Sequence, residues 1–199
     1  MNSIDVLPDV TFADRGRISR KFLSLKINTL HDACRWVKRL PYGYNSFDGD
    51  SMLLFEEGMG TCMSKHGAIA ELAEEIGISL HKYVGFYKLD DEIIDGIQDT
   101  LTPFGLRYIP QMHCVLGSHS CFVDLTEGNC HGKKKDILDM DLFVRAPANL
   151  TKEMKEDLYI YGLQYFKNAD PDLKKHSDAE CLLILKKCND AHKNYCSLL

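Results

Sequence analysis

The sequence lacks both a long apolar run and an excess of positive charge. No stretch of its 199 residues approaches the apolar length of a membrane span. Lysine and arginine total 24 against 29 aspartates and glutamates, which gives a formal net charge of −5. This balance provides no basic surface for a nucleic acid or an anionic membrane. We therefore expect a protein, a peptide or a small amide as the partner, and neither nucleic acid nor membrane.

The sequence also lacks the features of a secretion signal and of a disulfide framework. The N-terminus has no basic segment followed by an apolar one. The chain has 8 cysteines, but a chain of this length can build a core without disulfides. We therefore expect a cytoplasmic protein whose thiols are free.

The spacing of the metal-ligating residue types does not favour a metal site. Zinc sites use closely paired ligands such as C-x₂-C, and no such pair occurs. Asp48 and Asp50 lie in a turn that offers too few oxygens for calcium. We expect no metal and no cofactor. A metal-binding redox protein stays an alternative because one region is dense in soft ligands: His113, Cys114, His119, Cys121, Cys130 and His131.

A glycine-containing loop that runs into a helix is the most informative stretch. Gly58 and Gly60 precede Thr61, a residue type that caps helices, and Gly77 is expected to end the helix. Cys62 falls in the first turn, where the positive end of the helix dipole favours the thiolate and can lower a cysteine pKa from about 8.5. Cys62 is therefore a candidate nucleophile. Apolar residues follow at helical spacing: Ile69, Leu72, Ala73 and Ile76.

Two β-prone runs downstream, residues 108–116 and 121–126, flank a short polar turn and predict a hairpin. His113 lies in the first strand and Asp124 near the end of the second. Because side chains alternate along paired strands, these two side chains can share a face. A thiolate, an imidazole and a carboxylate together form a cysteine-type acyl-transfer site.

The Cys62, His113 and Asp124 motifs, in this order, resemble those of the transglutaminase-like superfamily over residues 28–126. The resemblance implies an α+β fold with a papain-like core, in which a nucleophile helix packs on an antiparallel sheet. It also implies that Cys62 is the nucleophile, that His113 is the general base and acid, and that Asp124 orients the imidazole.

We expect three parts in the chain: an N-terminal lead-in segment (1–27), a transglutaminase-like catalytic core (28–147) and a C-terminal helical extension (148–199). Patterning predicts a packing helix over 28–40 in the core. It also predicts helices over 151–167 and 177–196, which would pack on the core or on a partner. The apolar faces of these last two helices are Met154, Leu158, Tyr161 and Tyr165 in one, and Cys181, Ile184, Leu185 and Cys188 in the other.

Several further residues are candidates for the site. Donors to a tetrahedral intermediate, or substrate contacts, are Tyr42, Tyr44, Asn45 and Gln111. His66 lies one turn after Cys62 and is expected to be a polar packing residue rather than a rival base. Residues 88–105 are extra relative to the superfamily and predict a short helix and loop, either a lid over the cleft or an ornament away from it.

The sequence therefore favours a cysteine-dependent enzyme that cleaves or transfers a peptide or amide carbonyl through a Cys62 thioester. Hydrolysis, as in a protease or amidase, is favoured because transfer requires a site that excludes water. The alternatives are transglutaminase-type transfer to an amine and a non-catalytic binding module on the same fold.

Overall fold

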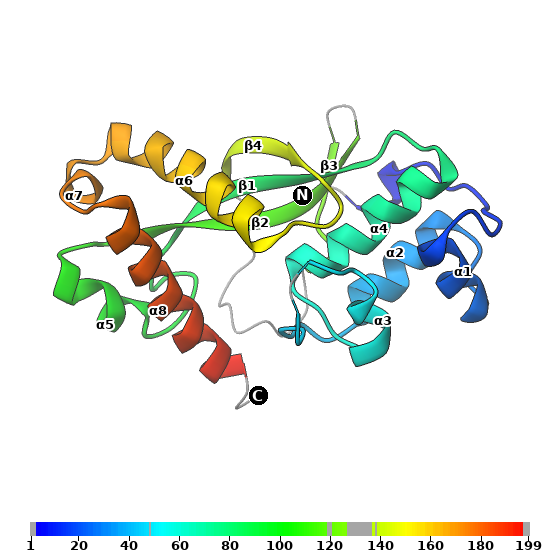
Figure 1. The fold of residues 1–199 in the computed structure, drawn as a ribbon, viewed down its shortest axis with the longest axis horizontal. Coiled ribbons are helices and arrows are strands. Elements are labelled where there is room, and N and C mark those ends of the chain that lie inside the picture. Colours follow the sequence, from blue (N-terminus) through cyan, green and yellow to red (C-terminus); the bar gives the residue numbers. More distant parts are fainter. Residues whose placement is uncertain (1–2, 48, 119–120, 127–136, 138, 197–199) are drawn as a thin grey trace. The chain divides into compact units, whose positions relative to one another are not determined.

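The structure is a computed structural model that describes residues 3–47, 49–118, 121–126, 137 and 139–196 (Figure 1). Asp48, His119, Cys130 and His131 lie outside these ranges. The described chain combines helices with a four-stranded antiparallel sheet of order β3-β2-β1-β4. The strands are β1 His81–Leu89, β2 Ile109–Ser118, β3 Cys121–Val123 and β4 Asp141–Ala146. The helices are η1 Ile4–Val6, α1 Arg17–Ser24, α2 Leu30–Arg39, α3 Leu53–Glu57, α4 Cys62–Ile76, α5 Ile97–Leu101, η2 Thr102–Phe104, α6 Lys152–Ala169, α7 Pro171–Lys174 and α8 Asp178–Cys196.

The chain groups into two compact units, each assembled from segments that are far apart in sequence. The first unit contains residues 1–84, 114–129 and 144–152, and the second contains 85–113, 130–143 and 153–199. The boundary in β2 falls between His113 and Cys114. The linear order of the chain does not predict this grouping, because each unit is assembled from three separate segments.

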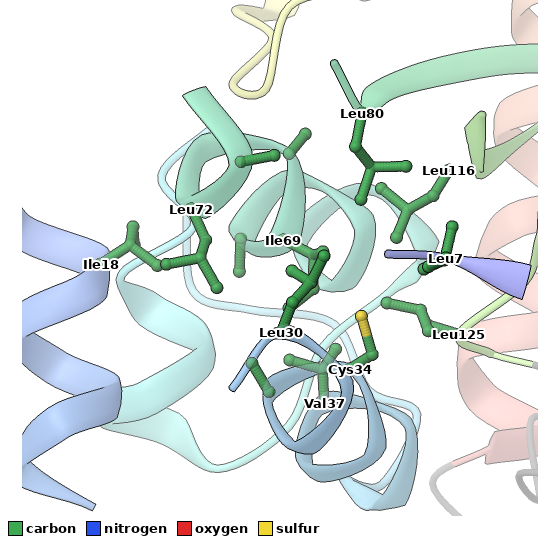
Figure 2. Packing of buried hydrophobic residues seen from close by; sticks show 14 of the residues in the cluster. Leu7, Ile18, Leu30, Cys34, Val37, Ile69, Leu72, Leu80, Leu116 and Leu125 are labelled. Atoms are coloured by element: carbon green, nitrogen blue, oxygen red, sulfur yellow. The ribbon is translucent and has the colours of Figure 1, made fainter. Parts of the chain in front are cut away.

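The core of the first unit forms where α1 and α2 pack against α4 (Figure 2). Leu30 of α2 lies beside Ile69 of α4, and Leu72 of α4 lies beside Ile18 of α1. Val37 of α2 belongs to the same cluster. Leu116 of β2 belongs to the same buried cluster. The helix predicted after Cys62 is therefore the central element of this unit.

The N-terminal lead-in takes part in this core. Its apolar residues are few, but Leu7, Phe12, Ile18 and Phe22 are all buried. The Phe22 ring packs edge-to-face on Trp36, at 5.7 Å between centroids. The apolar residues of the lead-in show no helical or strand periodicity, because α1 is short and the other buried residues lie in irregular segments. The sequence therefore did not predict that this segment joins the core.

The helix over 28–40 and the hairpin are confirmed. Thr29 caps α2 by accepting a hydrogen bond from the Asp32 N–H, and α2 ends before Pro41. In the hairpin β2 pairs antiparallel with β3, with Leu116 opposite Val123. Other elements have no counterpart in the sequence prediction, among them α1, α3 and the strand β4. The residues of β4 are mostly exposed or half-buried.

In the second unit α8 buries its predicted face, whereas α6 does not. Cys181, Ile184, Leu185 and Cys188 are buried, as predicted. The predicted face of α6 is wrong, because Met154, Tyr161 and Tyr165 are exposed. The buried residues of α6 are Tyr159, Gly162, Leu163, Phe166 and Lys167. Gly162 lies directly against the Phe86 ring, where any side chain would collide, and this close approach fixes the rotation of α6.

The segment 88–105 forms the end of β1, α5 and η2. Its apolar residues Ile93, Ile94, Ile97 and Leu101 are buried. Within the second unit α5 packs against α8. The predicted short helix is confirmed, and the lid stays a prediction.

A side chain of α4 caps the N-terminus of α1. Gly16 at the N-cap has no side chain, and the backbone N–H groups of Ile18 and Ser19 donate to the Glu75 carboxylate at 2.8 and 2.7 Å. Hydrogen bonds to a charged acceptor at a helix N-terminus are among the stronger ones. Glu75 therefore ties α1 to α4.

We predict that Glu75→Ala lowers the free energy of unfolding by about 2 kcal/mol, because two N–H groups of α1 lose their acceptor. The neighbouring Glu74→Ala is the matched control, because Glu74 is exposed. Urea denaturation of both variants measures the difference. Equal stabilities would show that Glu75 does not cap α1.

Candidate functional site

Cys62 occupies the first position of the 15-residue helix α4. Thr61 at the N-cap is extended (φ −80°, ψ 178°), and its side chain makes no capping hydrogen bond to any residue that the structure describes. The first N–H groups of the helix therefore keep their positive potential. Cys62 is 7% exposed and is not part of a disulfide.

Gly60, two residues before Cys62, allows the chain that leads into α4 to pack closely. Gly60 donates its N–H to the Pro41 carbonyl at 3.2 Å and accepts from the Gly43 N–H at 3.3 Å. A Cβ on Gly60 would lie 2.6 Å from Leu54 Cδ1, so no other residue fits without displacement. The loop that begins at Pro41 therefore lies beside the chain that leads into Cys62.

Asn45, which the sequence analysis named as a candidate donor to the substrate, stabilises the loop itself. Its Nδ2 donates to Glu57 Oε2 and to the Met59 carbonyl, both at 2.9 Å. Both amide hydrogens are therefore used inside the loop. Tyr42 forms a parallel bridge with Gly60, and its ring packs edge-to-face on Tyr44 at 6.2 Å between centroids.

His66 joins the first turn of α4 to the chain after β3. Its Nδ1 lies 2.8 Å from the Cys62 carbonyl, and its Nε2 lies 2.8 Å from the Leu125 nitrogen. A carbonyl only accepts and an N–H only donates, so the partners require a neutral ring with the hydrogen on Nδ1. His66 is fully buried. It is a packing residue, as predicted, and its two nitrogens are not available as a base.

Asp124 lies just beyond the end of β3 and is 5% exposed. Its Oδ1 accepts hydrogen bonds from the Thr126 N–H at 2.7 Å and from the Thr126 hydroxyl at 2.6 Å. The same oxygen lies 3.5 Å from His66 Nε2. That contact is not an ion pair, because Nε2 already accepts from Leu125. Asp124 is thus held in one orientation by its own turn.

The Cys62 thiol has a neighbour that the sequence analysis did not assign to the site. Cys114 of β2 is hydrogen-bonded to Cys62, and this contact, together with complete burial, raises the pKa of Cys114 well above its usual range. Its Sγ also lies 3.2 Å from Sδ of Met63. The alternation of side chains along a strand places Cys114 and His113 on opposite faces of β2. That alternation was the only signal in the sequence that separated these two residues.

His113 and Gln111 belong to the second unit. His113 is 1% exposed, and its ring meets the Tyr87 ring edge-to-face at 6.5 Å between centroids. Gln111 donates from Nε2 to Asn189 Oδ1 at 2.6 Å, and its Oε1 accepts from the Met112 N–H. The first unit thus contains Cys62 and Asp124, and the second contains His113.

Lys65 places a buried ammonium group in the first unit, within the electrostatic reach of Asp124. Its ammonium donates to the carbonyl of Leu40, the C-cap residue of α2. Burial lowers the pKa of Lys65 to about 8, although the attraction of Asp124 acts to raise it. The charged form is therefore costly in the folded state at neutral pH.

The buried thiols of Cys34 and Cys188 lack the surroundings that activate a nucleophilic cysteine. Burial raises the pKa of Cys34 to about 12 and that of Cys188 to about 11. Thiols of this kind react slowly with electrophiles because little thiolate is present. They serve as internal references for the reactivity of Cys62.

In the parts of the chain that the structure describes, no three His, Cys, Asp or Glu side chains are arranged to hold a metal ion. Asp50 instead pairs with Arg17 at 2.9 Å and accepts from the Met52 N–H. No helix in the described ranges has the length and apolar character needed to cross a bilayer.

Comparison with family models, with curated proteins and with solved structures found no match for this chain.

We predict that His66→Ala destabilises the protein by about 2–4 kcal/mol, because it leaves the buried Leu125 N–H without its acceptor and opens a cavity. His81→Ala, which alters a half-buried histidine of β1, is the control. Thermal denaturation and hydrogen exchange at the Leu125 amide report the change. Unchanged exchange at Leu125 in H66A would contradict the assigned contact.

The lowered pKa of Lys65 predicts a pH effect of definite sign. Between about pH 8 and the ordinary lysine pKa of 10.5 the unfolded chain binds a proton that the folded protein does not. Stability relative to Lys65→Met therefore rises with pH in this window, by at most about 1.4 kcal/mol per pH unit. Urea denaturation at several pH values measures this, with the exposed Lys186→Met as control. A pH-independent difference between wild type and K65M would refute it.

Proposed function

We propose that the protein is a cysteine-dependent acyl-transfer enzyme of the transglutaminase-like type, in which Cys62 attacks a peptide or amide carbonyl. The observation that carries the proposal is the position of the Cys62 thiol at the N-terminus of α4, a helix of 15 residues with no capping side chain from Thr61 among the described residues. Such a position favours thiolate. A buried and hydrogen-bonded carboxylate, that of Asp124, is present in the same unit.

The proposed chemistry assigns one role to each residue. The Cys62 thiolate adds to the carbonyl carbon, and backbone N–H groups at the start of α4 stabilise the oxyanion. His113 gives a proton to the leaving amine and later takes one from water, while Asp124 orients the imidazole. Water then releases the thioester as a carboxylic acid. His113 is assigned to the general-base step by the order of the motifs in the sequence, although alternation along β2 places it on the face opposite Cys114. His66 does not compete for this role, because both of its ring nitrogens are committed to Cys62 and Leu125.

Hydrolysis is the favoured outcome, and transfer to an amine is the alternative. Both pass through the same thioester, and they differ in whether water or an amine reaches it. A protein, a peptide or a small amide is the substrate class.

We predict that iodoacetamide labels Cys62 faster than any other thiol below pH 7, and that His113→Ala slows this labelling about tenfold or more at pH 6. The reason is that a thiolate without its imidazolium partner returns toward a pKa of about 8.5. Peptide mass spectrometry follows each cysteine, with Cys34 and Cys188 as slow references. The matched control is His81→Ala, which changes a histidine outside the site.

Two outcomes would contradict the proposal. Cys62 could label no faster than Cys121, the half-exposed thiol of β3, in which case a non-catalytic binding module replaces the enzyme. Alternatively, H113A could label as fast as wild type, in which case His113 is not the base.

A further inference from the structure

Three sulfur atoms meet where the first turn of α4 contacts β2 within the first unit. The thiols of Cys62 and Cys114 are hydrogen-bonded to each other, and Cys114 Sγ lies 3.2 Å from Met63 Sδ. We call Cys62, Met63 and Cys114 the sulfur cluster. Neither cysteine is part of a disulfide, so the cluster contains two thiols that are already in contact.

The two thiols differ in access and in their protonation. Cys114 is fully buried in β2, and its raised pKa keeps its proton in place. Cys62 is 7% exposed and lies at the positive end of α4. An oxidant that reaches the cluster therefore meets the Cys62 sulfur first, and the sulfur next to it is a thiol.

We propose that Cys62 and Cys114 are a redox pair, in which Cys114 captures oxidised Cys62 as a reversible disulfide. The oxidant is a hydroperoxide such as hydrogen peroxide. The disulfide can form whether or not the protein is an enzyme. If the protein is the enzyme proposed above, oxidation of Cys62 also stops catalysis, and this consequence rests on that proposed function.

The reaction balances in two steps. The Cys62 thiolate attacks one peroxide oxygen, so that an S–O bond forms, the O–O bond breaks, and hydroxide leaves and takes a proton to become water. Cys62 is then a sulfenic acid. Because the two side chains are in contact, Cys114 passes its proton to the hydroxyl of the sulfenic acid as its sulfur attacks the Cys62 sulfur. The S–S bond forms, the S–O bond breaks, and the hydroxyl group leaves as a second water. Two thiols are oxidised and one peroxide is reduced, and an added dithiol reverses the change.

The pairing also protects Cys62. A sulfenic acid without a neighbouring thiol is oxidised further to sulfinic acid, which thiols do not reduce. With Cys114 in contact, capture competes with this second oxidation. The proposed acyl transfer does not use the buried residue Cys114. The redox pair gives this residue a defined chemical role.

The test treats the full-length protein with hydrogen peroxide, blocks remaining thiols with N-ethylmaleimide and maps the peptides without reduction. Trypsin leaves Cys62 on residues 40–65 and Cys114 on residues 108–133, which also carry Cys121 and Cys130. We expect these two peptides to be joined, with the mass of two hydrogens lost, and fragment ions to assign the bond to Cys114. Dithiothreitol should restore alkylation of Cys62 completely.

Two variants sharpen the result. In Cys114→Ala the joined peptide should be lost, and Cys62 should proceed to sulfinic acid, so that dithiothreitol no longer restores its alkylation. Cys121→Ala is the matched control, because it removes another thiol of the same tryptic peptide that lies outside the cluster, and it should leave the joined peptide intact. The proposal is overturned if wild type yields no Cys62–Cys114 link, or if Cys62 overoxidises equally in wild type and C114A.

Failure of this inference and failure of the proposed function give different results. A Cys62–Cys114 link in a protein that never forms an acyl-enzyme supports the redox pair and rejects the enzyme. An acyl-enzyme at Cys62 without the link supports the enzyme and rejects the redox pair.

Discussion

Burial of α4 on nearly every side is the constraint on which the first unit depends. Such burial requires small residues wherever another backbone approaches, and a Cβ on Gly67 would lie only 2.6 Å from the Ala148 carbonyl oxygen. It also requires partners for each polar group that enters the core. Lys65 donates a hydrogen bond to the Leu40 carbonyl at the end of α2, and His66 accepts one from the N–H of Leu125. The polar residues of this helix are therefore part of its packing.

The same constraint fixes the surroundings of Cys62. The chain before it is held by backbone pairing at Gly60, the turn that contains it is tied to Leu125 through His66, and its sulfur contacts Cys114. A thiol held in this way has a defined direction at the start of a helix, which is what a nucleophile requires. It also has a second thiol within reach, which is what a reversible oxidation requires. One local arrangement thus supports both proposals, and the experiments separate them.

Local patterns in the sequence predicted the elements that carry the site. The helix from Cys62 to Gly77, the helix before Pro41 and the hairpin all follow from periodicity and from turn residues. Contacts between distant segments were not predictable in this way. Glu75 as the cap of α1, and the bond between His66 and Leu125, join residues more than fifty positions apart. The apolar face of α6 was misread because tyrosines tolerate exposure, while Gly162, which carries no side chain, marks the true contact. The contact of Cys114 with Cys62 depends on how α4 lies on β2, and composition does not report that.

The central claim, that Cys62 is an acyl-forming nucleophile, is tested most directly by trapping the acyl group. The protein is incubated with an activated ester such as p-nitrophenyl acetate, quenched in acid and mapped by peptide mass spectrometry. The account predicts an acetyl group on Cys62 that water removes over time and that is absent in H113A. An acetyl group spread equally over Cys62 and Cys121, or none on Cys62, would contradict it.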